Sequence, residues 1–303
     1  MLIRACSGLY MDSTVGKPPV AWQPLTPRGV AAFARAPLGR LLVVQFIVAI
    51  LAAATVVWFL HDAWFPTITE AIDQLPTQGA IRDGRLDWHG DSPAALAEGY
   101  FLALTVDLRH EGQARSPAQI QVEFGQADFK IFSLLGFVQG IYPQDWVVAF
   151  NRLDLVPWWG AWAPVILGIV AGLVIVWLML IWTLLATVYA LPVWLLGFFA
   201  NRKLSLRGSW RLAGAALMPG TLVLTTAIFC YGSGAFDLIR LALAGAAHLL
   251  LGWIYLIAAP LRLPLHQEAA LVKENPFVPP PKEDAPPANE KPEAEREPPV
   301  AGG

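Results

Sequence analysis

Charged side chains are scarce in this sequence. They make up 15% of its 303 residues, against about 25% in an average soluble domain, while hydrophobic residues make up 56%. This composition excludes an ordinary soluble domain and indicates an integral membrane protein. The formal net charge of -2 is too small to indicate nucleic acid as a partner.

Cysteine and catalytic motifs are scarce as well. Cys6 is near the N-terminus and Cys230 ends a late apolar run, so we expect them on opposite sides of a membrane and without a disulfide framework. The chain has no G-x-S-x-G, H-E-x-x-H, G-x-G-x-x-G or phosphate-loop motif. We therefore expect a protein that is not an enzyme and needs no cofactor.

Long apolar runs take the place of these features. Residues 41–60 contain one polar side chain, Gln45, and match the roughly 20 residues that a helix needs to cross a bilayer. Residues 158–200 carry no charge, and these 43 residues are too many for one straight span and barely enough for two. The sequence therefore leaves two topologies open for this run.

Basic residues favour one of them. Residues 201–211 carry four basic side chains and no acid, and a two-span hairpin before them would place these charges outside the cell. Because cytoplasmic loops are enriched in Lys and Arg, we favour one tilted helix over about 161–188. Pro192 would end it, and residues 193–200 would then lie along the inner interface.

Two more helices complete a membrane domain over residues 158–260. They are expected at 212–231, with a break at Pro219-Gly220, and at 241–259. With the helix at 41–60, the predicted fold class is an all-α polytopic membrane protein of about four transmembrane helices. A small α+β extracytoplasmic domain is inserted after the first helix, and both termini are cytoplasmic.

The inserted domain, residues 61–157, is acidic: up to residue 156 it carries thirteen acidic and six basic side chains, as expected outside the cytoplasm. Asp83-Gly84 lies between two short alternating segments and predicts a hairpin turn. Ser92-Pro93 and the alanines after it suggest a short helix. Residues 100–108 and 119–124 alternate as strands do.

The two ends of the chain are polar. Residues 1–40 form a basic, Pro-rich segment that we interpret as a cytoplasmic leader, with translation starting at Met1 or Met11. Residues 261–303 are rich in proline and charge, especially from Lys273 onward, and cannot bury enough apolar surface to fold. We expect a disordered cytoplasmic tail there.

One cluster in the acidic segment suggests metal-ligand chemistry. A strand period of two would bring Asp87, His89 and Asp91 to one face. The simpler interpretation is a solvated hairpin strand, because no second His or Glu has recognisable ligand spacing. We therefore predict no metal site and keep these three residues as candidates.

Two features of the predicted helices suggest packing. His248 lies at the centre of the last helix, where a neighbouring helix could offer a carbonyl or hydroxyl, or where the ring could handle protons in a transporter. The absence of charged residues near the middle of the spans favours hydrogen-bonded packing. Gly168 and Gly172 form a G-x-x-x-G, for which we favour packing within the chain over homodimerisation.

The order of these parts resembles a family of uncharacterised bacterial inner-membrane proteins. The similarity lies in an N-terminal span, a domain that begins I-x-D-G-x-L (Ile81, Asp83, Gly84, Leu86) and several later spans. Residues 202–220, RKLSLRGSWRLAGAALMPG, are also similar to the Yip1-type membrane domain. The resemblance implies a location in the bacterial inner (plasma) membrane and no established catalytic residues.

The sequence thus favours a non-enzymatic envelope protein that contacts lipid, an accessory or scaffold subunit whose outer domain binds a protein partner. Homo-oligomers fit this interpretation. The alternative is a component of a small-molecule transporter with a cavity around His248. A metal-dependent extracytoplasmic hydrolase that uses Asp87, His89 and Asp91 ranks third.

Overall fold

The computed structural model describes residues 22–134 and 136–265. The expected tail from residue 266, the start of the leader and Cys6 lie outside the described residues. The first helices are α1 (Pro27–Ala32), the 3-10 turn η1 (Phe33–Arg35), α2 (Leu38–Phe59), the π-helical turn η2 (Leu60–Trp64) and α3 (Phe65–Asp73). Four more follow the β domain: α4 (Arg152–Phe199), α5 (Leu206–Ala216), α6 (Met218–Gly232) and α7 (Leu238–Ala258), before the 3-10 turn η3 (Pro260–Arg262).

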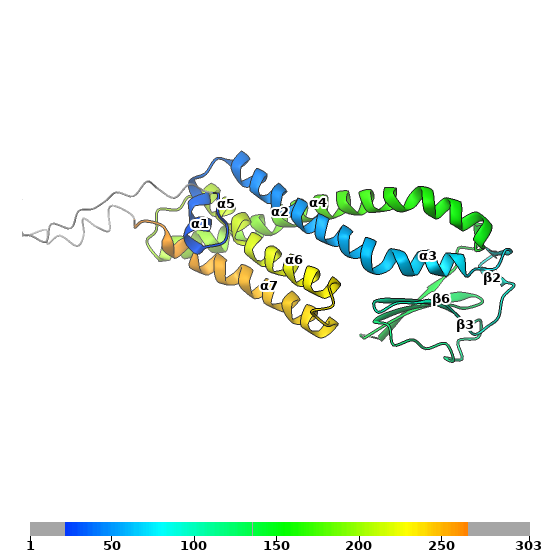
Figure 1. Ribbon diagram of the computed structural model, residues 1–303. Helices are drawn as coiled ribbons and strands as arrows, with labels where there is room; N and C mark the ends of the chain where they lie inside the picture. Colours follow the sequence, from blue (N-terminus) through cyan, green and yellow to red (C-terminus); the bar gives the residue numbers. More distant parts are fainter. Residues whose placement is uncertain (1–21, 135, 266–303) are drawn as a thin grey trace, which may run out of the picture. The chain divides into compact units, whose positions relative to one another are not determined.

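The predicted fold class is confirmed at this level. The described chain is mostly helical, with a small β domain between its first and later long helices (Figure 1). Within the described residues, four helical stretches are long and apolar enough to cross a membrane: Leu38–Asp73, Arg152–Phe199, Leu206–Gly232 and Leu238–Arg262.

These four candidate membrane helices differ in length. At 1.5 Å per residue, α4 with its 48 residues is about 72 Å long, while α7 with 21 residues is about 32 Å long, close to a hydrocarbon core. The rings of Phe59 in α2 and Tyr231 in α6 lie 5.5 Å apart, so these two residues are at one level. The chain beyond Phe59 therefore projects past the end of α6.

Two helix ends differ from the sequence prediction. The first helix continues beyond residue 60, through η2 and α3 to Asp73. The long apolar run forms one helix, as favoured, but α4 begins at Arg152 and continues through Pro192 to Phe199, so no separate interfacial segment exists at 193–200. A proline removes one backbone donor, and the remaining bonds of this long apolar helix hold it together.

The break expected near Pro219 is present, and Gln45 lies beside it. Helix α5 ends at Ala216 and α6 starts at Met218. Because α5 ends at Ala216, its last carbonyls need other donors in an apolar setting. The buried Gln45 side chain donates from Nε2 to the carbonyl oxygen of Gly214 at 3.2 Å, which joins α2 to α5.

The end of the helical bundle that carries the basic residues 201–211 also has a packed core. Val30 in α1 and Phe33 in η1 are fully buried in the same core as Leu41, Leu212 and Met218. Part of the expected polar leader therefore folds against the helices. The Arg202 guanidinium donates to the carbonyl of Leu263 at 2.7 Å. A basic side chain thus satisfies a backbone carbonyl just after η3.

The β domain consists of two sheets. Three strands pair in the order β2-β1-β8, and five in the order β3-β4-β5-β6-β7, with β4 and β5 parallel and the other neighbours antiparallel. The strands are β1 (Gly79–Arg82), β2 (Arg85–Trp88), β3 (Ala94–Glu98), β4 (Leu102–Val106), β5 (Ile120–Phe124), β6 (Asp128–Ser133), β7 (Gly136–Ile141) and β8 (Val148–Ala149).

The local predictions in this domain divide. Asp83 and Gly84, with φ of 49° and 71°, form the two-residue turn between Arg82 and Arg85, as expected. The short helix expected after Ser92-Pro93 is wrong, because Ala94–Glu98 is strand β3. Pairing with β4 overrides the helix preference of its alanines.

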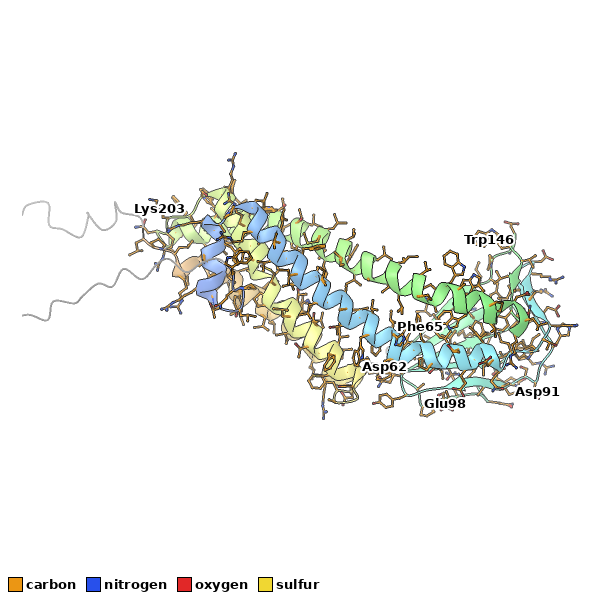
Figure 2. The ribbon with its side chains drawn as sticks, turned by 45° about the horizontal axis from the view of Figure 1, so that its top comes forward. Asp62, Phe65, Asp91, Glu98, Trp146 and Lys203 are labelled. Carbon is orange, nitrogen blue, oxygen red and sulfur yellow. The ribbon has the colours of Figure 1, made fainter. Side chains whose placement is uncertain are left out.

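Helix α3 and residues 152–162 of α4 form a two-helix stalk that holds the β domain. Phe65 of α3 is labelled in Figure 2. Its ring packs on Trp159 of α4 with centroids 4.7 Å apart, and the Trp159 indole donates to Thr69 Oγ1 at 2.9 Å. Arg152 pairs with Asp73 at 3.3 Å. The domain also reaches the bundle, because the Phe101 ring packs between Phe59 and Tyr231.

The Gln45 contact gives a first prediction. Gln45→Leu leaves the Gly214 carbonyl without this donor and should lower the unfolding free energy of the full chain in detergent by about 0.6–1.7 kcal/mol, the range of interhelical hydrogen bonds. Phe46→Leu, at an exposed neighbouring position, is the control and should change stability little. Equal stability of the Gln45→Leu and control proteins would show that the bond contributes nothing.

Candidate functional site

The three candidate metal ligands do not converge. Strand β2 ends at Trp88, whose indole lies over Gly90 and donates to the carbonyl of Asp91 at 2.9 Å, so the chain turns before His89 and Asp91 can follow the strand period. Asp87 Oδ1 and His89 Nδ1 are 3.8 Å apart, and both side chains are more than half exposed. Over residues 22–134 and 136–265, no group of three His, Cys, Asp or Glu is placed to hold a metal ion.

His248 bonds within its own helix. Its Nδ1 lies at hydrogen-bond distance from the carbonyl of Gly245, one turn earlier in α7. Thr225 of the neighbouring helix α6 also bonds within its own helix, because its hydroxyl donates to the carbonyl oxygen of Thr221. The neighbouring helix α6 instead approaches the His248 backbone closely through a glycine. A Cβ on Gly220 would lie 2.4 Å from the His248 carbonyl oxygen. Backbones thus nearly touch at this level.

Gly168 and Gly172 do not serve the expected packing. A Cβ placed on either glycine would meet no heavy atom within 4 Å among the described residues. The face that they form on α4 is therefore open, and packing within the described chain does not explain the pair.

A buried polar cluster lies instead in the β domain, in residues that the sequence analysis did not select. The His110 ring lies between two carboxylates, with Nδ1 2.5 Å from Glu123 Oε1 and Nε2 3.0 Å from Asp128 Oδ1. Glu123 is 1% exposed. The amide of Gln139 in β7 donates to the other oxygen of Asp128. The cluster thus joins β5, β6, β7 and the connection after β4.

The local backbone fixes the histidine in this place. Asp107, also buried, accepts the backbone N–H groups of Arg109 at 3.3 Å and Gly112 at 2.9 Å, and so closes the turn that carries His110. His110 adopts φ of 55°, a left-handed conformation that such a turn must hold. A Cβ on Gly125 would lie 2.2 Å from His110 Nε2, so only glycine leaves room for the ring.

The protons of this cluster limit its chemistry. Each bond between a ring nitrogen and a carboxylate oxygen needs a proton, so His110, Glu123 and Asp128 share at least two protons in this geometry. Both ring nitrogens are engaged, and His110 has no lone pair directed at a substrate or metal. The arrangement therefore serves to fasten strands together and does not resemble a general base.

Tyr142 closes the same region. Its hydroxyl donates to the carbonyl of Gly125 at 3.0 Å, and the side chain is buried. Burial, with a smaller contribution from the Asp128 carboxylate, raises the pKa of Tyr142 well above its usual value. The hydroxyl therefore remains a donor at physiological pH and holds Gly125 against His110.

The strand fastened by this cluster carries an unusual surface. Strand β7 is the last strand of its sheet, with one edge unpaired within the described residues. Phe137, Val138 and Ile141 are 60%, 69% and 79% exposed, and Leu134 before the strand is exposed as well. Consecutive positions on both faces of an edge strand are therefore apolar, which differs from the charged edges that usually prevent strand pairing.

Only part of the His110 cluster and of the β7 surface can be predicted from the sequence. Gln121 and Glu123 alternate with Val122 and Phe124, which indicates a strand with one polar face, but burial of that polar face has no sequence signal. His110 lies in a connection with no ligand spacing. The apolar excess at β6 and β7 is readable, whereas its exposure is not.

Comparisons with known proteins add no identity. No family model, no curated protein and no solved structure matches this chain. The class of protein rests on the structure itself: four long apolar helices with a small β-sheet domain.

The cluster gives a second prediction. His110→Leu removes the ring that lies between the Glu123 and Asp128 carboxylates, and should reduce the stability of the β domain by about 3–5 kcal/mol, the cost of breaking a buried pair. Hydrogen exchange of β5 and β6 amides in the full chain would measure this loss. The double variant His110→Leu, Glu123→Leu should recover part of it.

His89→Leu is the matched control, because that histidine is exposed and its ion pair with Asp87 is long; a change within about 0.5 kcal/mol is expected. Unchanged exchange in His110→Leu would contradict the fastening role of the cluster.

Proposed function

We propose that this protein is a non-enzymatic integral membrane protein of a bacterial inner membrane, an accessory or scaffold subunit that holds a β domain outside the cytoplasm for a protein partner. Helix length and hydropathy support membrane insertion. With four spans, both chain ends lie on one side of the membrane and the β domain lies on the other.

The charges at the two ends of the bundle support this orientation. The end away from the β domain carries exclusively basic charges in the link from Asn201 to Arg211, and Arg40 and Arg262 flank the helices there. Since basic flanks stay in the cytoplasm, this end is the cytoplasmic one. The acidic β domain is then outside.

The observation that carries the partner hypothesis is the exposed apolar edge of β7. An unpaired strand edge is a template for main-chain pairing, and alternate side chains supply specificity when an extended segment is added. The Asp128–Gln139 bond joins β7 to the His110 cluster and keeps the edge in shape for such a partner. We infer that a strand of another protein pairs with β7.

This gives a third prediction. A photo-crosslinking residue at position 138, introduced in living cells, should yield one discrete protein adduct. The additional change Ile141→Lys should remove it, because a lysine on the strand edge opposes the pairing of a further strand. A crosslinking residue at position 87, also exposed in the same domain, is the control and should not capture that protein.

A pattern that is identical at positions 138 and 87, or unaffected by Ile141→Lys at normal protein levels, would contradict strand pairing at β7.

A further inference from the structure

A pocket of about 470 Å³ lies between the tip of the β6–β7 hairpin and the start of α7. Figure 1 shows the strands of the five-stranded sheet near the turn that joins α6 to α7. The walls of the pocket combine polar and apolar side chains. The polar ones include Arg115, Gln119, Gln121 and Asp237, and the apolar ones include Leu134 and Ile239.

Arg115 supplies the charge that is available in this pocket. Its guanidinium stacks on the Phe132 ring, with the central carbon 3.9 Å from the ring centroid. No acidic side chain within the part of the chain that the structure describes forms an ion pair with Arg115. A stacked guanidinium keeps its N–H groups at the rim of the ring plane, where they can bind a phosphate with two donors.

The other polar groups are already engaged. Asp237 caps α7 by accepting the backbone N–H of Arg240 at 2.7 Å, and its second oxygen lies 3.8 Å from the Arg240 guanidinium. Gln121 donates to Thr105 and Ala114, and Gln119 accepts from Tyr231. The negative charge of Asp237 is thus balanced locally, and Arg115 determines the preference for an anion.

The apolar wall of the pocket is exposed. Leu134 from the hairpin and Ile239 from the first turn of α7 are both more than half exposed. Because α7 is barely longer than a hydrocarbon core, its first turn must lie where the acyl chains meet the headgroups. A cation beside exposed apolar side chains at that depth matches a phospholipid, whose phosphate and acyl chains are joined in one molecule.

We propose that this pocket binds a phospholipid of the leaflet on the β-domain side, with its phosphate on Arg115 and its acyl chains along Leu134 and Ile239. The lipid bridges the hairpin and α7 beside the Gln119–Tyr231 contact. This inference rests on the membrane insertion in the proposed function, but is independent of any partner at β7.

The test is native mass spectrometry of the full chain released from detergent, with a phospholipid and a diacylglycerol of the same acyl chains as probes. Wild type should retain the phospholipid and not the diacylglycerol. Arg115→Gln should weaken phospholipid binding at least about tenfold, because a charge-assisted hydrogen bond is lost. Arg109→Gln, in the same connection and paired with Glu111, is the control and should bind as wild type does.

Ile239→Ser tests the apolar wall separately and should also weaken binding. Equal retention of diacylglycerol, or phospholipid binding that is unchanged in Arg115→Gln, would overturn the proposal. Displacement of the phospholipid by millimolar inorganic phosphate would also overturn it, because the site would then recognise a soluble anion. Since the experiment measures lipid binding by the full chain and neither its orientation nor its protein contacts, each of these failures leaves the membrane topology and the β7 partner standing.

Discussion

The unequal length of the four candidate membrane helices is the constraint on which the rest of this structure depends. Helix α7 is about as long as a hydrocarbon core is thick, whereas α4 is more than twice that length. The start of α4 and the continuation of α2 into α3 extend beyond the ends of α6 and α7. They pair with each other as the stalk, and the stalk positions the β domain.

The contacts at the base of the domain follow from this arrangement. The Phe101 ring meets Phe59 and Tyr231 where the short helices end, while Arg152 and Asp73 close the far end of the stalk. The domain is therefore fixed at two levels. Inside it, the Glu123–His110–Asp128 cluster fastens the strands that lead to β7, so that an exposed apolar strand is attached to a largely buried polar cluster.

Burial of such charges is costly unless they are paired, and one oxygen of Glu123 remains buried without a hydrogen-bond partner among the described residues. Replacing the whole cluster by apolar residues could preserve stability. What the cluster adds is a fixed register between β5, β6 and β7, which an apolar core specifies less strictly.

Much of the fold was readable from the sequence, because uncharged runs of about 20 residues and an Asp-Gly turn are local signals. The end of the first helix was not, since His61 and Asp62 in η2 look like the end of a span. Asp62 is labelled in Figure 2, just before the stalk. The helix end predicted at Pro192 and the helix predicted at the alanines of β3 were wrong, because helix continuity and strand pairing there depend on neighbouring residues. The candidate site was largely hidden, because the pairing of β5 with β6 brings Glu123 and Asp128 together and the turn closed by Asp107 adds His110.

The central claim is that the four apolar helices cross the membrane with the β domain outside and the basic links inside. Single cysteines at positions 87 and 207, in a background with Cys6→Ser and Cys230→Ser, would test it by labelling intact spheroplasts with a membrane-impermeant maleimide. The account predicts that position 87 is labelled at once and position 207 only after the membrane is permeabilised. Labelling of position 207 in intact spheroplasts, or protection of position 87, would contradict it.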